Sequence, residues 1–294
     1  MAKARALDKR RKSIRNIRKI TRTMELIATA RFKKAMDRAT AATSYTKRIT
    51  QLVGDLAKSG LKVSHPLLEQ RDKINSAKLL ILTANRGLCG GYNGSTLRSA
   101  LARLAELQSS VPKVSVEVAG KRGIAAMKFR KIDFDQGFTQ FNDQPAFAEV
   151  EAIANRYLQA FISGEIDRLD VVYTKFVSIS KQVVVAETLL PLGSLDGAEE
   201  GSSGSTSESM YEFMPSAESI LEEVVPSSFR VKLFKCFLDA AVSEQIARMV
   251  AMKSATENAS EMIKQLSMTY NRARQSQITG EIMEIIGGVE ALNG

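Results

Sequence analysis

The sequence predicts a mixed α/β protein whose two ends form a long antiparallel coiled coil, with a globular α/β domain between them. Residues 1–53 and 227–279 contain neither Gly nor Pro and are rich in helix formers. At ~1.5 Å per residue, each stretch can extend as a helix of roughly 80 Å. Between them the hydrophobic pattern alternates between strand-like and helix-like segments, which is typical of a mostly parallel sheet covered by helices. We therefore expect three regions: an N-terminal helix at 1–60, a central domain at 61–214 and a C-terminal helix at 215–294.

A seam of small or apolar residues, spaced three and four apart, runs along each terminal segment and predicts close helix pairing. In the N-terminal segment the seam is Ile14, Ile17, Thr21, Met24, Ala28, Arg31 and Ala35, and it is imperfect because Thr21 and Arg31 interrupt it. In the C-terminal segment it is Met249, Met252, Ala255, Ala259, Met262, Leu266, Thr269 and Ala273. The long C-terminal helix is expected to begin near Ser227, after a separate short helix at 216–225 that stops before Pro226.

The middle of the chain predicts a Rossmann-like α/β domain. Strands are expected at 78–83, 114–119, 131–134, 169–177 and 182–189, the last two as an antiparallel hairpin. Helices are expected at 95–108, 123–129 and 145–163. Residues 193–209 are rich in Gly and Ser and acidic, which predicts a flexible surface loop.

The charge of the chain is concentrated at its start. The formal net charge is +10, but residues 1–48 alone hold sixteen Lys or Arg against three acids, which is +13. A basic helix of this kind favours an acidic partner such as nucleic acid, anionic lipid or an acidic protein surface, the alternative being a merely solvated face. The segment has few aromatic side chains for stacking on bases, which disfavours nucleic acid.

The residues offer no catalytic constellation. The glycine-rich loop 85–94 follows a predicted strand, yet its spacing does not match a dinucleotide fingerprint or a P-loop. Cys89 lies in this loop, and the single histidine, His65, lies in the linker after the first helix, so no base is paired with the thiol. The two cysteines, Cys89 and Cys236, form no disulfide framework, and no Cys/His cluster indicates a metal. We expect no cofactor, no metal and no catalysis by the chain alone.

Four segments, in order along the chain, resemble the gamma subunit of F-type ATP synthases. Residues 20–32 (ITRTMELIATARF) are similar to the family's N-terminal "ITKAMEMVAASK", and 86–93 (RGLCGGYN) to its "RGLCGGFN". Residues 247–259 (ARMVAMKSATENA) look like "ARMVAMKSATDNA", and 270–284 carry the closing signature. Asn85 stands where the family usually has Asp, and Gly288-Val289 replaces a usual Gly-Ala. The loop 193–209 has no cysteine, so the thiol switch of plastid relatives is not implied.

The resemblance implies a central rotor shaft that couples rotation of a c-ring, driven by proton flow, to the cycling of catalytic beta subunits in ATP synthesis. Its implied partners are three alpha and three beta subunits around the shaft, the epsilon subunit and the c-ring. It also implies contacts for particular residues. Met24, Cys89, Arg274 and Gln275 would contact the beta subunit. Thr279, Glu281 and Glu284 would lie in the upper bearing that holds the terminal helix.

Two features of the sequence bear on location. No apolar run approaches the ~18–20 residues that span a bilayer, and no signal peptide is recognisable. With the resemblance, this predicts peripheral attachment, through the c-ring, to the cytoplasmic face of a bacterial plasma membrane. The competing hypotheses are a nucleotide-binding α/β enzyme and a basic coiled-coil protein that binds nucleic acid. The sequence leaves open the coupling ion, the ring size, the regulatory mode and the role of loop 193–209.

Overall fold

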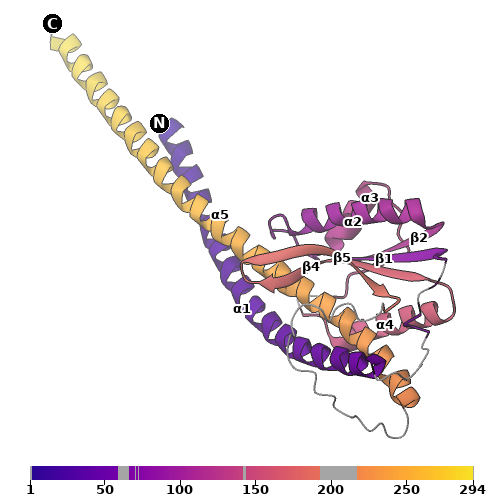
Figure 1. Ribbon diagram of the computed structural model, residues 1–294. Helices are drawn as coiled ribbons and strands as arrows, with labels where there is room; N and C mark the ends of the chain where they lie inside the picture. The colour runs from indigo at the N-terminus through magenta and orange to yellow at the C-terminus, as the bar shows by residue number, and fades with distance from the viewer. Residues whose placement is uncertain are drawn as a thin grey trace. The chain divides into compact units, whose positions relative to one another are not determined.

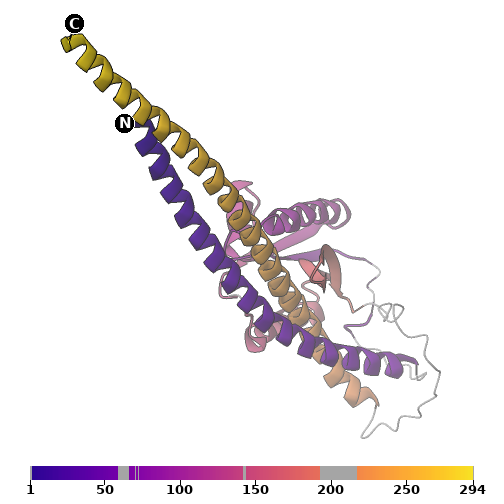
Figure 2. The ribbon, with the colours of Figure 1, turned by 90° about the vertical axis from the view of Figure 1, so that its left-hand side faces the viewer.

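The computed structural model describes residues 2–58, 66–69, 71, 73–141, 144–192 and 217–293, with side chains placed for 4–41 and 222–291 of the terminal helices. His65, the loop 193–209 and the expected junctions near 60 and 214 lie outside these residues. Two very long helices flank the sheet in sequence, α1 (Ala2–Lys58) and α5 (Ala217–Asn293). Both views show them side by side and antiparallel (Figures 1 and 2). The predicted fold class is confirmed.

The chain divides into two compact units. The helix-pair unit comprises 1–29 and 248–294, and the sheet unit comprises 30–247. The sheet unit contains β1 (Ser76–Leu82), α2 (Tyr92–Ser110), β2 (Lys113–Ala119), α3 (Lys121–Phe129), β3 (Gln136–Phe138), α4 (Phe147–Ile162), β4 (Arg168–Ser178) and β5 (Lys181–Leu190).

The sheet is five-stranded in the order β3-β2-β1-β4-β5. The first four strands of this order are parallel, and β5 pairs antiparallel with β4, as expected for the predicted hairpin. The change of direction along the strand order, with β2 on one side of β1 and β4 on the other, is that of a doubly wound sheet. The central strand β1 carries a continuous apolar run, 79–82, because both of its faces are covered.

Successive side chains of β1 point to opposite faces of the sheet, so they pack in two separate hydrophobic cores. Leu79 and Ile81 pack with α2 and α3, together with Leu104, Leu107 and Met127. Leu80 and Leu82 pack on the opposite face with α4 and the first part of α5, including Tyr157, Phe161, Phe229 and Leu233. Figure 1 shows α2 and α3 over one face of the sheet and α4 under the other.

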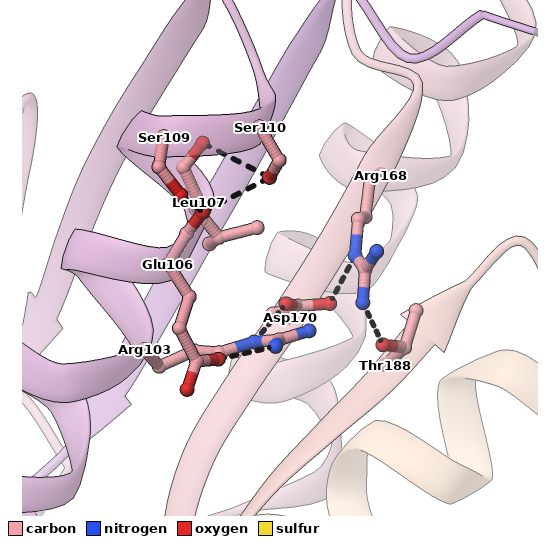
Figure 3. A network of polar contacts seen from close by, with 8 residues as sticks. All are labelled: Arg103, Glu106, Leu107, Ser109, Ser110, Arg168, Asp170 and Thr188. Atoms are coloured by element: carbon pink, nitrogen blue, oxygen red, sulfur yellow. Dashed lines mark hydrogen bonds and ion pairs between the residues drawn. The ribbon is translucent and has the colours of Figure 1, made fainter.

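One buried carboxylate of the sheet unit is paired with two arginines. Asp170 of β4 is fully buried and accepts hydrogen bonds from Arg103 of α2 (2.7 Å) and from Arg168 (2.9 Å). Arg168 also donates to Thr188 of β5 at 2.8 Å, so one network ties a helix to two strands (Figure 3). Pairing of this kind is required because an isolated buried charge is costly. The network therefore fixes how α2 sits on the β4–β5 hairpin.

Two predicted elements were wrong. Residues 131–134 are not a strand, because Lys131 adopts a left-handed conformation (φ 57°) and the chain turns there, so that β3 begins only at Gln136. The helix break at Pro226 is also wrong, since α5 runs through Pro226 without interruption. Proline removes one helical N–H donor. Burial of Val225 and Phe229, both 0% exposed, compensates in this position.

Candidate functional site: the helix-pair unit and the glycine-rich loop

The helix-pair unit is held by a narrow seam of small contacts. Among the described side chains of this unit, the buried apolar residues are Ala28, Met252 and Ala259. The Thr256 hydroxyl donates to the Thr21 hydroxyl at 2.8 Å, joining the two helices. Alanine at such positions lets two backbones approach closely, so the predicted seam is right in outline.

The seam departs from prediction toward the end of α5. Met262 and Thr269 are exposed, whereas Ile263 and Tyr270, one residue later, are partly buried. A straight helix turns once in 3.6 residues, whereas steps that alternate between three and four residues average 3.5. Positions chosen by that alternation therefore move gradually off the face that contacts the other helix. Ile17 of α1 is likewise exposed.

Arg11 and Tyr270 add a polar contact between the same helices. The Arg11 guanidinium lies 4.6 Å from the centre of the Tyr270 ring, a cation–π arrangement. Asp8 accepts hydrogen bonds from Lys12 and Arg11, and these lower the pKa of its carboxyl group. Asp8 therefore stays ionised and orients two of the cations of α1.

A cation-rich groove lies beside this contact, between the start of α1 and α5. Its lining residues come from both helices: Ala4, Arg5, Asp8, Lys9, Lys12, Tyr270, Arg274, Gln277 and Ile278. Four of these side chains are cationic and one is acidic, so the groove favours a negatively charged partner. Arg274, predicted from the family resemblance, thus has Arg5 and Lys9 as companions that the sequence reasoning missed.

The last part of α5 is exposed all round. Every residue from 278 to 291 is exposed. Five of the six large apolar residues fall on one face of the helix: Ile278, Ile282, Ile285, Ile286 and Val289, with Met283 to one side of it. We call this face the apolar tip. The sequence analysis did not predict the apolar tip, although the helical spacing of these residues can be recognised in the sequence.

The residues predicted to contact partners differ in their exposure. Met24 is partly buried in the seam, whereas Arg274 and Gln275 are exposed on the helix-pair unit. Thr279, Glu281 and Glu284 are exposed on the turns that carry the apolar tip. Cys89, in the sheet unit, is only 2% exposed.

The glycine-rich loop between β1 and α2 is tightly anchored. The Asn85 side chain accepts from the Lys121 N–H at 3.0 Å and donates to the Thr139 and Phe141 carbonyls. Asn93 accepts from the Ala84 N–H at 2.9 Å and donates to the Cys89 sulfur at 3.1 Å. The side chains of Asn85 and Asn93 are therefore hydrogen-bonded within the sheet unit and hold the loop in place.

Among the described residues, no group of three or more His, Cys, Asp or Glu side chains is placed to hold a metal ion. Within the same residues, no helix combines the length and the apolar character needed to cross a membrane. Cys236 is buried beside Tyr173, and burial raises the pKa of its thiol to about 12, so it is held protonated.

Comparison with known proteins identifies the family. A profile of the family described as ATP synthase matches residues 3–292. The chain is 70% identical, over the full length of both chains, to the ATP synthase gamma chain of Rhodopirellula baltica. It is 39% identical, again over both full lengths, to the ATP synthase gamma chain of Leptospira biflexa.

Solved structures share the fold. A chain of the Euglena gracilis mitochondrial ATP synthase (OSCP/F1/c-ring, rotational state 3) superposes with a TM-score of 0.64 at 17% identity, covering 99% of this chain and 95% of that one. A rotor chain of the same enzyme gives a TM-score of 0.60 at 16% identity, covering 94% and 99%. With the full-length identity to two gamma chains, the helix pair and the doubly wound sheet lead to one conclusion: the chain belongs to the ATP synthase gamma-chain family.

Proposed function

We propose that this chain is the central rotor shaft of a proton-translocating F-type ATP synthase. As a gamma chain it is a non-catalytic subunit of the central stalk, and the bond-making steps belong to other subunits of the complex. The observation that carries the proposal is the antiparallel pairing of residues 2–29 with residues of α5 beyond 248, which ends in an exposed apolar tip. Family membership decides against the nucleotide-binding enzyme and the nucleic-acid binder as alternatives.

The shaft acts through its lack of symmetry. A pair of unequal helices presents a different surface in each direction, so a ring of subunits around it meets different contacts on each side. Each beta subunit then favours the conformation that binds the face in front of it best, because differential contact is what shifts such an equilibrium. Rotation of the shaft by the c-ring moves every beta subunit through its conformations in turn, and ATP hydrolysis drives the same cycle backwards.

The proposed partners are three alpha and three beta subunits around the helix pair, with the epsilon subunit and the c-ring at the sheet unit. The complex is membrane-associated, and we place this chain at the cytoplasmic face of a bacterial plasma membrane, attached peripherally through the c-ring. The division into an N-terminal helix (1–60), a central domain (61–214) and a C-terminal helix (215–294) remains part of the proposal.

Two sets of residues are proposed to make the contacts. Arg274 and Gln275 bind a beta-subunit loop, supported by the cation-rich groove that Arg274 lines. Met24 and the loop around Cys89 contact the acidic lever segment of a beta subunit. Thr279, Glu281 and Glu284 lie around the apolar tip, which suits an apolar collar formed by the surrounding ring.

Co-purification tests the proposal. A tagged copy of the chain, expressed in its source cell at native level, should bring down alpha and beta subunits in a fixed ratio, with epsilon and the c-ring present when mild detergent is used. Deleting the coding region for 278–294 should weaken recovery of alpha and beta while leaving the sheet unit folded. Recovery of the full chain without any alpha or beta subunit would refute the proposed function.

A further inference from the structure

The last turn of α3 exposes an aromatic ring among cations. Of the large apolar side chains that the structure describes, Phe129 is the most exposed, at 89%. It is the last residue of α3, and Lys128, Arg130 and Lys131 beside it are exposed as well. No acidic residue occurs between positions 121 and 131. We call Lys128–Lys131 the α3 end. A ring exposed to this degree adds almost nothing to the packing of its own chain.

The α3 end is held in one conformation by backbone hydrogen bonds. The Lys131 N–H donates to the Lys128 carbonyl at 3.1 Å, and the Ile132 N–H donates to the Met127 carbonyl at 3.0 Å. This is the Schellman pattern, in which a left-handed residue closes the helix and an apolar residue after it packs back against the helix. Ile132 packs against the core that contains the fully buried Met127. A fixed helix end therefore presents Phe129 to solvent.

The stability of α3 does not by itself explain these cations. The helix dipole favours a cation in the last turn, which accounts for Lys128. Glycine would fill the left-handed position of Lys131 with less strain, so a lysine there keeps a charge at a conformational cost. Lys121, exposed about two turns before Lys128, lies in the first turn, where the dipole disfavours a cation. The cations therefore suit an external anion better than they suit the helix.

The α3 end is separate from the glycine-rich loop. A helix that joins two parallel strands must lead back from their carboxyl ends toward their amino ends. β2 and β3 are parallel and α3 joins them, so α3 runs away from the carboxyl edge of the sheet. The glycine-rich loop lies at that carboxyl edge, after β1. None of the residues predicted to contact partners belongs to the α3 end.

We propose that the α3 end binds the surface of an anionic lipid bilayer. The Phe129 ring enters the boundary between headgroups and acyl chains, where aromatic side chains concentrate, while the three cations pair with lipid phosphates. A single-stranded nucleic acid fits less well, because its binding uses several aromatic faces in succession and this surface offers one. The contact goes beyond the proposed function, in which the chain reaches the membrane only through the c-ring.

A tryptophan in place of Phe129 tests the contact at the residue itself. The chain contains no Trp, so Phe129→Trp gives the full-length protein a single tryptophan. With vesicles of anionic phosphatidylglycerol, we expect its emission to shift to the blue and to be quenched by lipids brominated on the acyl chains. Vesicles of zwitterionic phosphatidylcholine should produce neither effect. Ile179→Trp is the control for position, because Ile179 is 60% exposed and lies in the β4–β5 turn. Its emission should not change.

Removal of charge separates the α3 end from the rest of the basic chain. Residues 1–48 can themselves attract anionic vesicles, so we compare two triple variants in the Phe129→Trp background. The first neutralises the α3 end, with Asn at the left-handed position, which Asn tolerates: Lys128→Gln, Arg130→Gln and Lys131→Asn. The second neutralises three exposed cations of α1: Arg10→Gln, Arg15→Gln and Arg18→Gln. Both variants lose the same charge.

The two triple variants should differ in the amount of lipid that half-quenches the tryptophan. Each cation at a lipid surface contributes a factor of about five in affinity, which corresponds to ~1 kcal/mol. The variant without the cations of the α3 end should therefore need roughly a hundredfold more phosphatidylglycerol. The variant of α1 should shift far less, because its substitutions lie outside the contact.

Several results would overturn the proposal. They are an absent response of the tryptophan to anionic vesicles, an equal response to phosphatidylcholine, and an equal shift in the two triple variants. Quenching by a single-stranded oligonucleotide in place of vesicles would assign the α3 end to nucleic acid and would overturn it too. These measurements do not depend on assembly with alpha and beta subunits, which co-purification tests, so the lipid contact and the proposed function can fail separately.

Discussion

The helix-pair unit and the sheet unit bury very different side chains. The sheet unit encloses Tyr157, Phe161 and Phe229 completely and pairs its buried Asp170 with two arginines. The helix-pair unit buries mainly alanines and leaves Ile20, Leu26 and Ile27 exposed. The sheet unit is therefore stabilised mainly by its own buried side chains. The helix-pair unit has small internal contacts and exposes apolar side chains that partners can cover.

Truncation of a core phenylalanine in the sheet unit should have the largest effect. Phe161 of α4 is fully buried, with Arg71 stacked on its ring at 4.7 Å. We expect Phe161→Ala to lower the free energy of unfolding by about 3–5 kcal/mol. Urea unfolding followed by circular dichroism measures this. Phe129→Ala is the matched control, because Phe129 is 89% exposed. Equal losses in the two variants would contradict the assignment of the core.

Asp239 should make the sheet unit pH-sensitive. Burial raises the pKa of its carboxyl group from 3.8 to about 6, with Lys235 and Lys175 opposing the shift and Glu187 adding to it. Among the described residues, its Oδ2 atom has no hydrogen-bond partner. The folded state therefore binds more protons than the unfolded state between about pH 4 and 6, so this group costs stability as the pH rises through that window.

We expect Asp239→Asn to raise the free energy of unfolding at pH 7.5 by at most ~3 kcal/mol, and to change it little at pH 4. Urea unfolding of wild type and variant at the two pH values measures this. Subtracting the wild-type free energy of unfolding from that of the variant at each pH removes the contribution of the other carboxyl groups, which both proteins share. A gain at pH 4 as large as that at pH 7.5 would mean that charge is not the cause.

The seam of the helix-pair unit should tolerate no extra volume. Ala259 is 4% exposed, so Ala259→Leu should force the helices apart at a cost of about 1–3 kcal/mol. Hydrogen exchange should accelerate in residues 2–29 and stay unchanged in the strands. Ala6→Leu, at an exposed position of α1, serves as the control. Faster exchange in the strands as well would break the distinction between the units.

Arg274→Ala should affect function while leaving stability almost untouched. Arg274 is exposed, so the free energy of unfolding should change by no more than ~0.5 kcal/mol. A charge-assisted contact shielded from water is worth about 1.5–3 kcal/mol, so ATP synthesis in reconstituted vesicles should fall clearly. Lys253→Ala, also exposed on α5, controls for loss of a cation. An unchanged rate of synthesis for Arg274→Ala would remove this residue from the proposed contacts.

The sequence was most informative where one physical signal dominated. The apolar run 79–82 predicted β1, because a strand in the middle of a parallel sheet is buried on both faces. The long stretches without Gly or Pro similarly predicted α1 and α5. Prediction failed where tertiary contacts outweighed a local rule, as at Pro226, and where a residue such as Lys131 adopts a backbone conformation that its type disfavours.

The candidate site was predictable only in part. Family motifs pointed to Arg274 and to the loop around Cys89, but spacing does not reveal exposure. Whether Leu88 or Cys89 faces outward depends on the bonds of Asn85 and Asn93, which join residues far apart in sequence, such as Asn85 and Phe141. The groove beside Arg274 likewise requires the register between α1 and α5, which the seam pattern gives only to within about one residue.

The apolar tip links the solubility of the chain to its assembly. Ile282, Ile285 and Ile286 remain in water until another molecule covers them, at least within the part of the chain that the structure describes. Overproduced alone, such molecules are expected to stick to one another through these ends in a concentration-dependent manner. A cell that makes this chain in step with the subunits that receive the tip would avoid that aggregation.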